Sequence, residues 1–229
     1  MNTNSNTYTI IYASVMVVIV AFLLAFVSNA LKPTQAANEK IDKMKQILSA
    51  LHIDASNVAD VPAEYKKYVK ADEIINSKGE VVKKEGGFKV DLKQELAKPL
   101  AERELPLYIC EVDGKTKYIV PMSGNGLWNI LWGYVALDED KNTIYGVYVD
   151  HAGETPGLGA EISTKQFQDQ FTNKELIENG KVVLSVVKNG KIQNPKYEVD
   201  GITGGTITSN GVDKMIKNSI EQYLTFLNK

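Results

Sequence analysis

The chain has 229 residues, of which 44% are hydrophobic and 24% charged, and its formal net charge at pH 7 is −2. This balance excludes the strongly basic surface that proteins use to bind nucleic acid. Residues 1–31 carry no charged side chain and no histidine, whereas the rest of the chain has an ordinary soluble composition, which excludes a multi-spanning membrane protein and a mostly disordered chain.

The apolar run from Ile10 to Leu31 is the first predicted element. As a helix it is about 33 Å long, enough to cross the hydrocarbon core of a bilayer. A cleavable signal peptide is the alternative, because Ser28-Asn29-Ala30 has a small-x-small pattern. No Lys or Arg precedes the run, and it is longer than a signal peptide needs, which favours a retained anchor. The lysines after it favour a cytoplasmic domain by charge counting; they are Lys32, Lys40, Lys43 and Lys45.

Two helices are predicted after the anchor. Pro33 is expected to end the membrane helix. Apolar residues then recur at helical spacing over Asn38–Leu51, which predicts an amphipathic helix leading into the domain. A second short helix is expected over Ala63–Val69.

The middle of the chain is predicted to form antiparallel strands. Alternating apolar residues at 107–112 and 116–122 flank Asp113-Gly114, a typical hairpin turn. The segments 132–138 and 143–151 flank the polar turn 139–142 and predict a second pair.

The C-terminal third is predicted to contain two helices and a strand. Thr164–Phe171 is expected to be helical, and 181–187 a strand ended by Asn189-Gly190. The last helix is expected to begin with Ser209 or Asn210 as its N-cap. Its apolar stripe comprises Val212, Met215, Ile216, Ile220, Tyr223, Leu224 and Leu227.

These elements predict an α+β fold, an antiparallel sheet with packed helices, preceded by one N-terminal transmembrane helix. We divide the chain into a tail and anchor (1–31), a connecting helical region (32–105) and an α+β domain (106–229).

Three segments rich in Gly and hydroxyl residues interrupt this pattern, and all three are expected to be loops: Ser123–Trp128 (SGNGLW), Glu154–Gly159 (ETPGLG) and Asp200–Gly211 (DGITGGTITSNG). The third leads into a helix, whose free N–H groups and dipole suit a phosphate. For a lone loop of this kind, a tight turn with an N-cap is the competing interpretation.

The three segments resemble a known family together. DGITGGTITS resembles a covalent flavinylation motif, in which flavin mononucleotide (FMN) is attached through its phosphate to the threonine at position 206. The apolar block, SGNGLW and ETPGLG occur in the same order as in the C subunits of the sodium-translocating NADH:quinone reductases. The motif usually has Ala where this chain has Gly205. A sibling family, the G subunits of the Rnf-type ferredoxin:NAD oxidoreductases, shares the anchor, ETPGLG and the Thr motif, but GLW favours the quinone-reductase family.

The resemblance implies a set of cofactor-binding residues. Thr206 would carry the FMN, Gly204 and Gly205 would allow close approach, and Thr203 and Thr208 would bond the phosphate. Leu127, Trp128 and Leu158 would pack against the isoalloxazine ring, although large apolar residues also serve as core. Glu154 and Thr155, with the backbone of Gly157 and Gly159, complete the set.

No catalytic residue and no metal site are expected. His151 and Glu154 have no third ligand nearby, and Cys110 is the only cysteine. The resemblance implies that Asp200 would be recognised by the flavin transferase. Residues 188–196 are interpreted as a solvated hairpin. A threonine hydroxyl is a poor nucleophile, so a separate flavin transferase must attach the FMN.

The resemblance implies a membrane-anchored flavoprotein subunit of an oxidoreductase that relays electrons through covalent FMN. Its partners would be the other membrane subunits, the flavin transferase and the lipid bilayer, but no nucleic acid. It would be a single-pass protein of the cytoplasmic membrane, with the FMN domain on the outer face. No GxGxxG follows a strand, so the chain is not expected to oxidise NADH by itself. A membrane-anchored binding domain without redox function is the remaining alternative.

Overall fold

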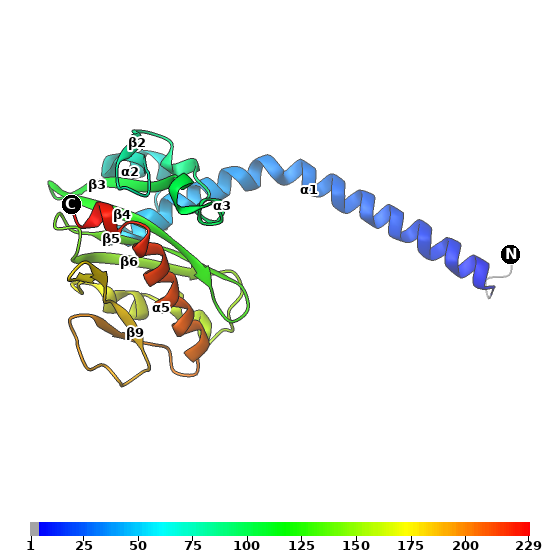
Figure 1. The fold of residues 1–229 in the computed structure, drawn as a ribbon. Coiled ribbons are helices and arrows are strands. Elements are labelled where there is room, and N and C mark those ends of the chain that lie inside the picture. The colour runs from blue at the N-terminus through cyan, green and yellow to red at the C-terminus, as the bar shows by residue number, and fades with distance from the viewer. Residues whose placement is uncertain (1–4) are drawn as a thin grey trace. The chain divides into compact units, whose positions relative to one another are not determined.

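A computed structural model of the chain describes residues 5–229. The chain divides into two compact units, Met1–Lys43 and Met44–Lys229, which are described separately. The ribbon in Figure 1 shows a long N-terminal helix, α1, and a domain of sheet and helices.

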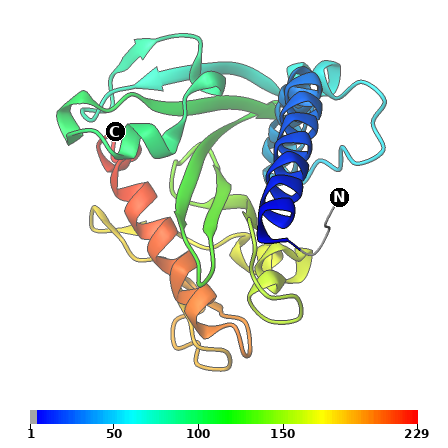
Figure 2. The same ribbon diagram turned by 90° about the vertical axis from the view of Figure 1, so that its right-hand side faces the viewer.

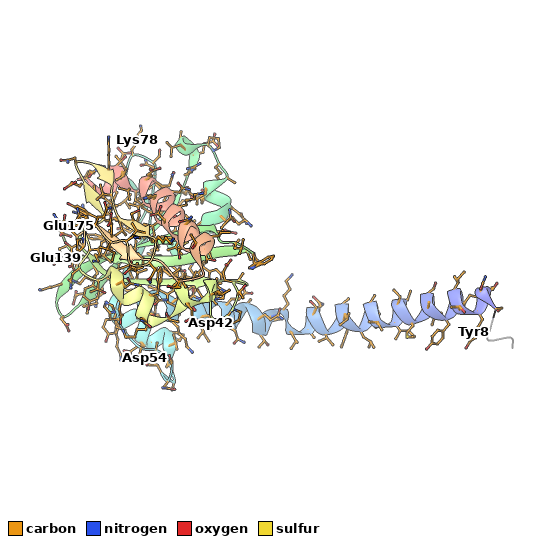
Figure 3. The ribbon with its side chains drawn as sticks, turned by 90° about the horizontal axis from the view of Figure 1, so that it is seen from below. Tyr8, Asp42, Asp54, Lys78, Glu139 and Glu175 are labelled. Atoms are coloured by element: carbon orange, nitrogen blue, oxygen red, sulfur yellow. The ribbon has the colours of Figure 1, made fainter. Side chains whose placement is uncertain are left out.

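Helix α1 (Asn6–Ala50) runs without a break through Pro33, so the expected end of the membrane helix at this proline is wrong. A proline removes one backbone donor and strains one turn, which can kink a helix without ending it. The apolar side chains of residues 10–31 are exposed, and Figure 3 shows the side chains of this helix projecting outward, Tyr8 among them. Among the described residues, α1 is the one helix long and apolar enough to span a membrane.

The second unit is built on a six-stranded sheet of order β2-β1-β3-β4-β5-β6, in which every neighbouring pair is antiparallel. Its strands are β1 Val69–Ile75, β2 Val81–Lys83, β3 Leu105–Val112, β4 Lys115–Asn125, β5 Ile130–Leu137 and β6 Ile144–His151. Both predicted hairpins are confirmed, and Asp113 and Gly114 have φ angles of 52° and 74°, as a tight hairpin turn requires. Strand β4 extends to Asn125, so the start of SGNGLW is strand rather than loop.

Helices cover both faces of this sheet. Helix α5 (Thr206–Glu221) lies beside the β4–β5 hairpin (Figure 2), and buries Val212, Met215 and Ile216 in a core that also contains Phe167 and Phe171. On the other side, Ile47 and Leu48 pack with Tyr108 and Ile119. The α+β fold with an antiparallel sheet is therefore confirmed.

The other helices are α2 Val61–Tyr68, α3 Leu92–Leu96, α4 Lys165–Gln168 and α6 Leu224–Leu227, with 3-10 turns η1 Gly87–Lys89, η2 Leu100–Glu102, η3 Gly159–Ser163 and η4 Asp169–Phe171.

Strands β1 and β2 lie in the region interpreted as a helical connection, yet they belong to the same sheet as β3. The division of the chain at residues 31 and 105 remains a prediction. Helix α2 agrees with the expected helix at 63–69, and α4 with η4 agrees with the one at 164–171.

Two local predictions are wrong. Helix α5 begins at Thr206 with Gly205 as its N-cap, because the Ser209 N–H already bonds to the Gly205 carbonyl. The expected strand 181–187 is divided into two strands, because the Val183 N–H donates a hydrogen bond to the Leu176 carbonyl. These are β8 (Lys181–Val182), paired with β7 (Ile177–Glu178), and β9 (Ser185–Val187), paired in parallel with β10 (Glu198–Asp200).

Candidate functional site

The three unusual segments meet at one end of the sheet. The 126–129 loop joins β4 to β5, the 152–158 loop follows β6, and the 201–205 loop precedes α5. Leu131 near the start of β5 pairs with His151 at the end of β6, so the first two loops leave the strands at the same end of the sheet. They enclose, with the third loop, a pocket of about 250 Å³, hereafter the first pocket. It is lined by Leu127, Glu154, Thr155, Leu158, Gly159, Gly204, Gly205, Thr206, Ile207 and Thr208.

The carboxylate of Glu154 connects these segments. Its side chain is buried, and it accepts hydrogen bonds from the Thr208 hydroxyl at 2.5 Å and from the Trp128 N–H at 3.0 Å. Burial raises the pKa of this carboxyl, but the hydrogen bonds from Thr208 and from the backbone of the 126–129 loop outweigh burial, so the Glu154 pKa lies below its ordinary value. Glu154 is therefore a charged link inside the site.

Two glycines allow this close packing. A Cβ on Gly159 would lie 2.3 Å from the Thr208 hydroxyl oxygen, and one on Gly126 would lie 2.3 Å from a Glu154 carboxylate oxygen. Both distances are far below van der Waals contact, so a side chain at either position would push the Glu154–Thr208 pair apart.

Thr206 is the first residue of α5, and its side chain is exposed. The first N–H groups of a helix have no intrahelical partner. The N-cap of α5, Gly205, has no side chain that could bond them. Thr208, two residues later, is only 2% exposed and its hydroxyl is bonded to Glu154. The structure thus separates the two threonines: Thr206 faces outward, whereas Thr208 holds the loops together.

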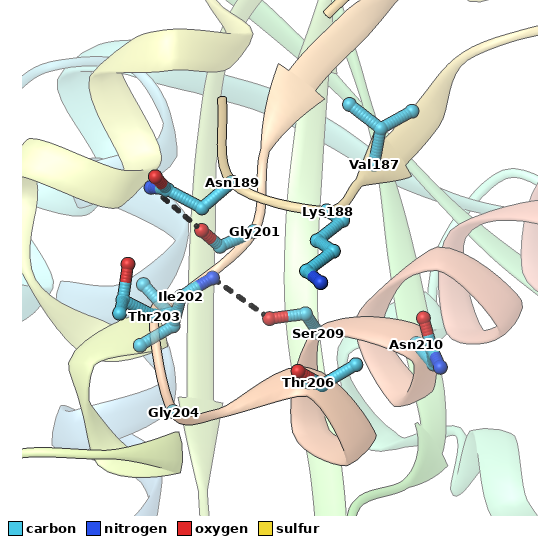
Figure 4. Close-up of a pocket in the computed structure, with 10 residues that line it drawn as sticks. All are labelled: Val187, Lys188, Asn189, Gly201, Ile202, Thr203, Gly204, Thr206, Ser209 and Asn210. Atoms are coloured by element: carbon cyan, nitrogen blue, oxygen red, sulfur yellow. Dashed lines mark hydrogen bonds between the residues drawn. The ribbon is translucent and has the colours of Figure 1, made fainter. Parts of the chain in front are cut away.

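A second pocket, of about 240 Å³, opens on the other side of Thr206 (Figure 4). Lys188 extends from the end of β9 toward the first turn of α5, and it has no ion-pair partner among residues 5–229. Thr203 also lines this pocket. The Ser209 hydroxyl accepts the Ile202 N–H at 2.8 Å and donates to the Gly205 carbonyl at 2.9 Å, which fixes the loop between the two pockets.

The sequence interpretation missed Lys188, which it placed in a solvated hairpin. The residue lines the same pocket as Thr206 because β9 and β10 pair in parallel, with Val187 opposite Asp200. No local pattern reveals this pairing. The Asp200 carboxylate accepts the Gly190 N–H at 2.7 Å and so holds the same turn.

Large apolar side chains are exposed at and next to the first pocket: Leu127, Leu158 and Ile207 line it, and Trp128 follows Leu127 in the chain. The exposed fraction is 69% for Trp128, 58% for Ile207, 48% for Leu127 and 43% for Leu158. Clustered exposure of this kind is typical of a binding surface. The competing interpretation of Leu127 and Trp128 as core residues is therefore wrong, and Ile207 is a residue of the rim that the sequence interpretation did not include.

The remaining predicted residues lie in the 152–158 loop. Thr155 is exposed beside the first pocket, and its carbonyl accepts the N–H groups of Leu158 and Ala160. The Gly157 N–H donates to the Glu161 carboxylate at 3.1 Å, so it is already engaged. His151 accepts the Glu154 N–H through Nδ1 at 3.1 Å, so its ring bonds the loop backbone.

Comparison with known proteins agrees with this geometry. A family model described as an FMN-binding domain matches residues 126–221, which include all three loops. The C subunit of the Na(+)-translocating NADH-quinone reductase from Pseudomonas aeruginosa is 31% identical, with 100% of this chain and 98% of that protein covered. The chain belongs to the family of these C subunits. The resemblance noted in the sequence is therefore confirmed.

Further relatives support the assignment. The C subunit of the same reductase from Haemophilus ducreyi is 29% identical, with 94% of this chain and 90% of that protein covered. The crystal structure of the C subunit from Parabacteroides distasonis has a TM-score of 0.80 and 41% identity, with 87% of this chain and 98% of that chain covered. By their names, these proteins are subunits of an oxidoreductase.

The residues present fit FMN. The exposed apolar rim suits an isoalloxazine ring. The uncapped first turn of α5 and the Lys188 ammonium suit a phosphate. Thr206 and Gly204 line both pockets. A group attached to Thr206 could therefore place its ring in the first pocket and its phosphate beside the second.

Proposed function

We propose that this chain is the membrane-anchored flavoprotein subunit of a Na⁺-translocating NADH:quinone reductase, and that it relays electrons through FMN attached by a phosphoester to Thr206. The observation that carries the proposal is the position of Thr206. It is the exposed threonine at the uncapped start of α5, between the two pockets, whereas Thr208 is buried and bonded to Glu154.

The phosphate would be held by backbone and charge. The first N–H groups of α5 point out of the helix, and the helix dipole favours a negative group there. Lys188 adds a positive charge on the side of the second pocket. Thr203, which lines the same pocket, offers a further hydroxyl.

The ring would be held by the apolar rim of the first pocket. Leu127 and Leu158 in the pocket lining offer apolar surface, the exposed Trp128 next to Leu127 would add to it, and Thr155 and the Gly159 backbone offer polar groups. When bound, FMN supplies the redox chemistry, because its ring system takes up and releases electrons. The protein supplies attachment, orientation and the surrounding charges.

A separate flavin transferase would attach the FMN. A threonine hydroxyl needs an adjacent base to act as a nucleophile. Among the described residues, the histidine at the end of β6, His151, has its Nδ1 engaged with the Glu154 N–H. Thr206 is therefore the acceptor residue of another enzyme's reaction.

The electron partners would be other subunits. The sequence has no GxGxxG after a strand, and its single cysteine, Cys110, is buried. The chain thus lacks the usual means to bind a dinucleotide or to carry a second redox centre. The names of the relatives support a quinone reductase rather than the ferredoxin-dependent sibling as the host complex.

We place the FMN domain on the outer face of the cytoplasmic membrane. Family resemblance supports this side, whereas the lysines after the anchor oppose it. Charge counting applies best to short loops, and large domains are translocated largely regardless of it. An alkaline phosphatase fusion at Lys229 should be active, and a fluorescent protein fusion at the same residue dark; the opposite pair of results would reverse the placement.

The attachment is tested by intact mass after coexpression with a flavin transferase. The mass of the full chain should increase by one FMN less one water, and Thr206→Ala should abolish the increase. Thr225→Ala is the control, because Thr225 is an exposed threonine on α6 that lines neither pocket. A modified Thr206→Ala protein would refute the assignment.

A further inference from the structure

Glu154 joins segments that are far apart in the sequence. Its two carboxylate oxygens accept the Trp128 N–H, 26 residues away, and the Thr208 hydroxyl, 54 residues away. The backbone N–H groups of Leu127 and Asn129 also face the carboxylate. One side chain therefore determines how the 126–129 loop sits against the 152–158 loop and the first turn of α5.

The contacts of this carboxylate require its ionised form. Every group directed at it is a donor, and an ionised carboxylate is an acceptor only. The 152–158 loop contains no Lys or Arg. Two side chains flanking this loop that could carry charge are engaged with the loop backbone: the His151 Nδ1 accepts the Glu154 N–H, and the Glu161 carboxylate accepts the Gly157 N–H. Among residues 5–229 Glu154 forms no ion pair, so hydrogen-bond donors hold its negative charge.

The carboxylate also lines the first pocket while only 5% of Glu154 is exposed. We propose that Glu154 is the positioning residue of the flavin site: it holds the two apolar loops and the Thr206 turn in one arrangement, and its fixed charge lowers the reduction potential of the ring bound beside it. This inference rests on the proposed function for the identity of the ring, but the positioning part concerns the protein alone.

The electrostatic part follows from the sign of the charge. Reduction adds negative charge to the ring system, and a buried carboxylate beside it opposes that addition more strongly than it would in water. Lys188 lies on the side of the second pocket, where the phosphate would be, so it would neutralise the phosphate first. Removal of the Glu154 charge should therefore make the ring easier to reduce.

Three variants of the full chain separate charge from geometry. Glu154→Gln removes the charge and nearly keeps the shape. Thr208→Val removes one donor and keeps the charge at neutral pH. Thr208→Ser restores the donor and is the conservative rescue. Each protein is prepared without flavin for amide hydrogen exchange, and with flavin for a reductive titration against a reference dye.

In the flavin-free proteins, exchange of the Leu127–Asn129 amides should be roughly tenfold or more faster in Glu154→Gln and in Thr208→Val than in the unmodified chain, because a hydrogen bond to a charged acceptor is weakened or lost. Thr208→Ser should exchange at the unmodified rate. Unchanged exchange in Thr208→Val would overturn the positioning part, and this comparison decides it even if Glu154→Gln does not fold.

In the loaded proteins, the midpoint potential of Glu154→Gln should be more positive, whereas that of Thr208→Val should change much less. An unchanged potential in Glu154→Gln, or equal shifts in both variants, would overturn the electrostatic part. Absence of covalent flavin from the unmodified chain would count against the proposed function, and the exchange result on the flavin-free protein would be unaffected.

Discussion

Replacement of Gly159 by alanine should destabilise the cofactor site measurably. The new Cβ would lie 2.3 Å from the Thr208 hydroxyl oxygen and 2.7 Å from a Glu154 carboxylate oxygen. Overpacking of this kind costs about 1–3 kcal/mol. If the Thr208–Glu154 bond breaks to relieve the clash, the loss of a hydrogen bond to a charged group costs a similar amount, about 1.5–3 kcal/mol.

The expected change is large enough for a thermal melt. For a domain of this size, 1 kcal/mol lowers the Tm by about 2–4 °C, so Gly159→Ala should melt about 2–12 °C lower. The assay is near-ultraviolet circular dichroism of the full chain in detergent. Gly153→Ala, in the same loop, is the matched control, because its Cβ would approach only the Asn129 Cβ at 4.0 Å. Equal melting temperatures for the two variants would refute the close packing inferred around Glu154.

Three further predictions concern charge and redox behaviour. Lys188→Ala should lower the fraction of chain that becomes flavinylated, seen as in-gel fluorescence, by up to about five-fold at low salt, because an exposed ion pair between this ammonium and the phosphate is worth up to about 1 kcal/mol. The flavin-loaded chain should stay oxidised in stopped-flow mixing with NADH and be reduced by dithionite. The Glu154 pKa is lowered in the folded state. The ionised carboxylate therefore stabilises the fold above its ordinary pKa of about 4.3, and this stabilisation is lost as the pH falls below that value. In urea titrations, the free energy of unfolding of Glu154→Gln should decrease less than that of the unmodified chain between about pH 5 and 3.

Each of these has a control and a contrary result. Lys191→Ala, on the exposed turn that follows Lys188, should flavinylate normally, and equal loss in both lysine variants would remove the specific role of Lys188. Rapid bleaching by NADH would show that the chain is an enzyme by itself. If the free energy of unfolding changed with pH equally in Glu154→Gln and in the unmodified chain, folding would not change the pKa of this carboxylate.

Much of the fold could be predicted from local patterns. The alternation at 107–122 and 132–151 predicted both hairpins, and Asp113-Gly114 predicted the turn between β3 and β4. Where local signals compete, prediction failed. Ser209 has the chemistry of an N-cap, but its hydroxyl bonds to Ile202 and Gly205 from within the first turn, so the N-cap of α5 is Gly205, four residues earlier.

The sequence by itself determined the long apolar N-terminal helix, the sheet hairpins, the family and the threonine expected to carry the cofactor. These depend on hydropathy, period and motif, which are properties of neighbouring residues. Only the tertiary structure decided that Thr208 and Glu154 bond across 54 residues and that Lys188 lines the same pocket as Thr206. The physical reason is that a buried hydrogen bond and a parallel strand pair depend on which distant segments pack together, and no spacing within one segment encodes that choice.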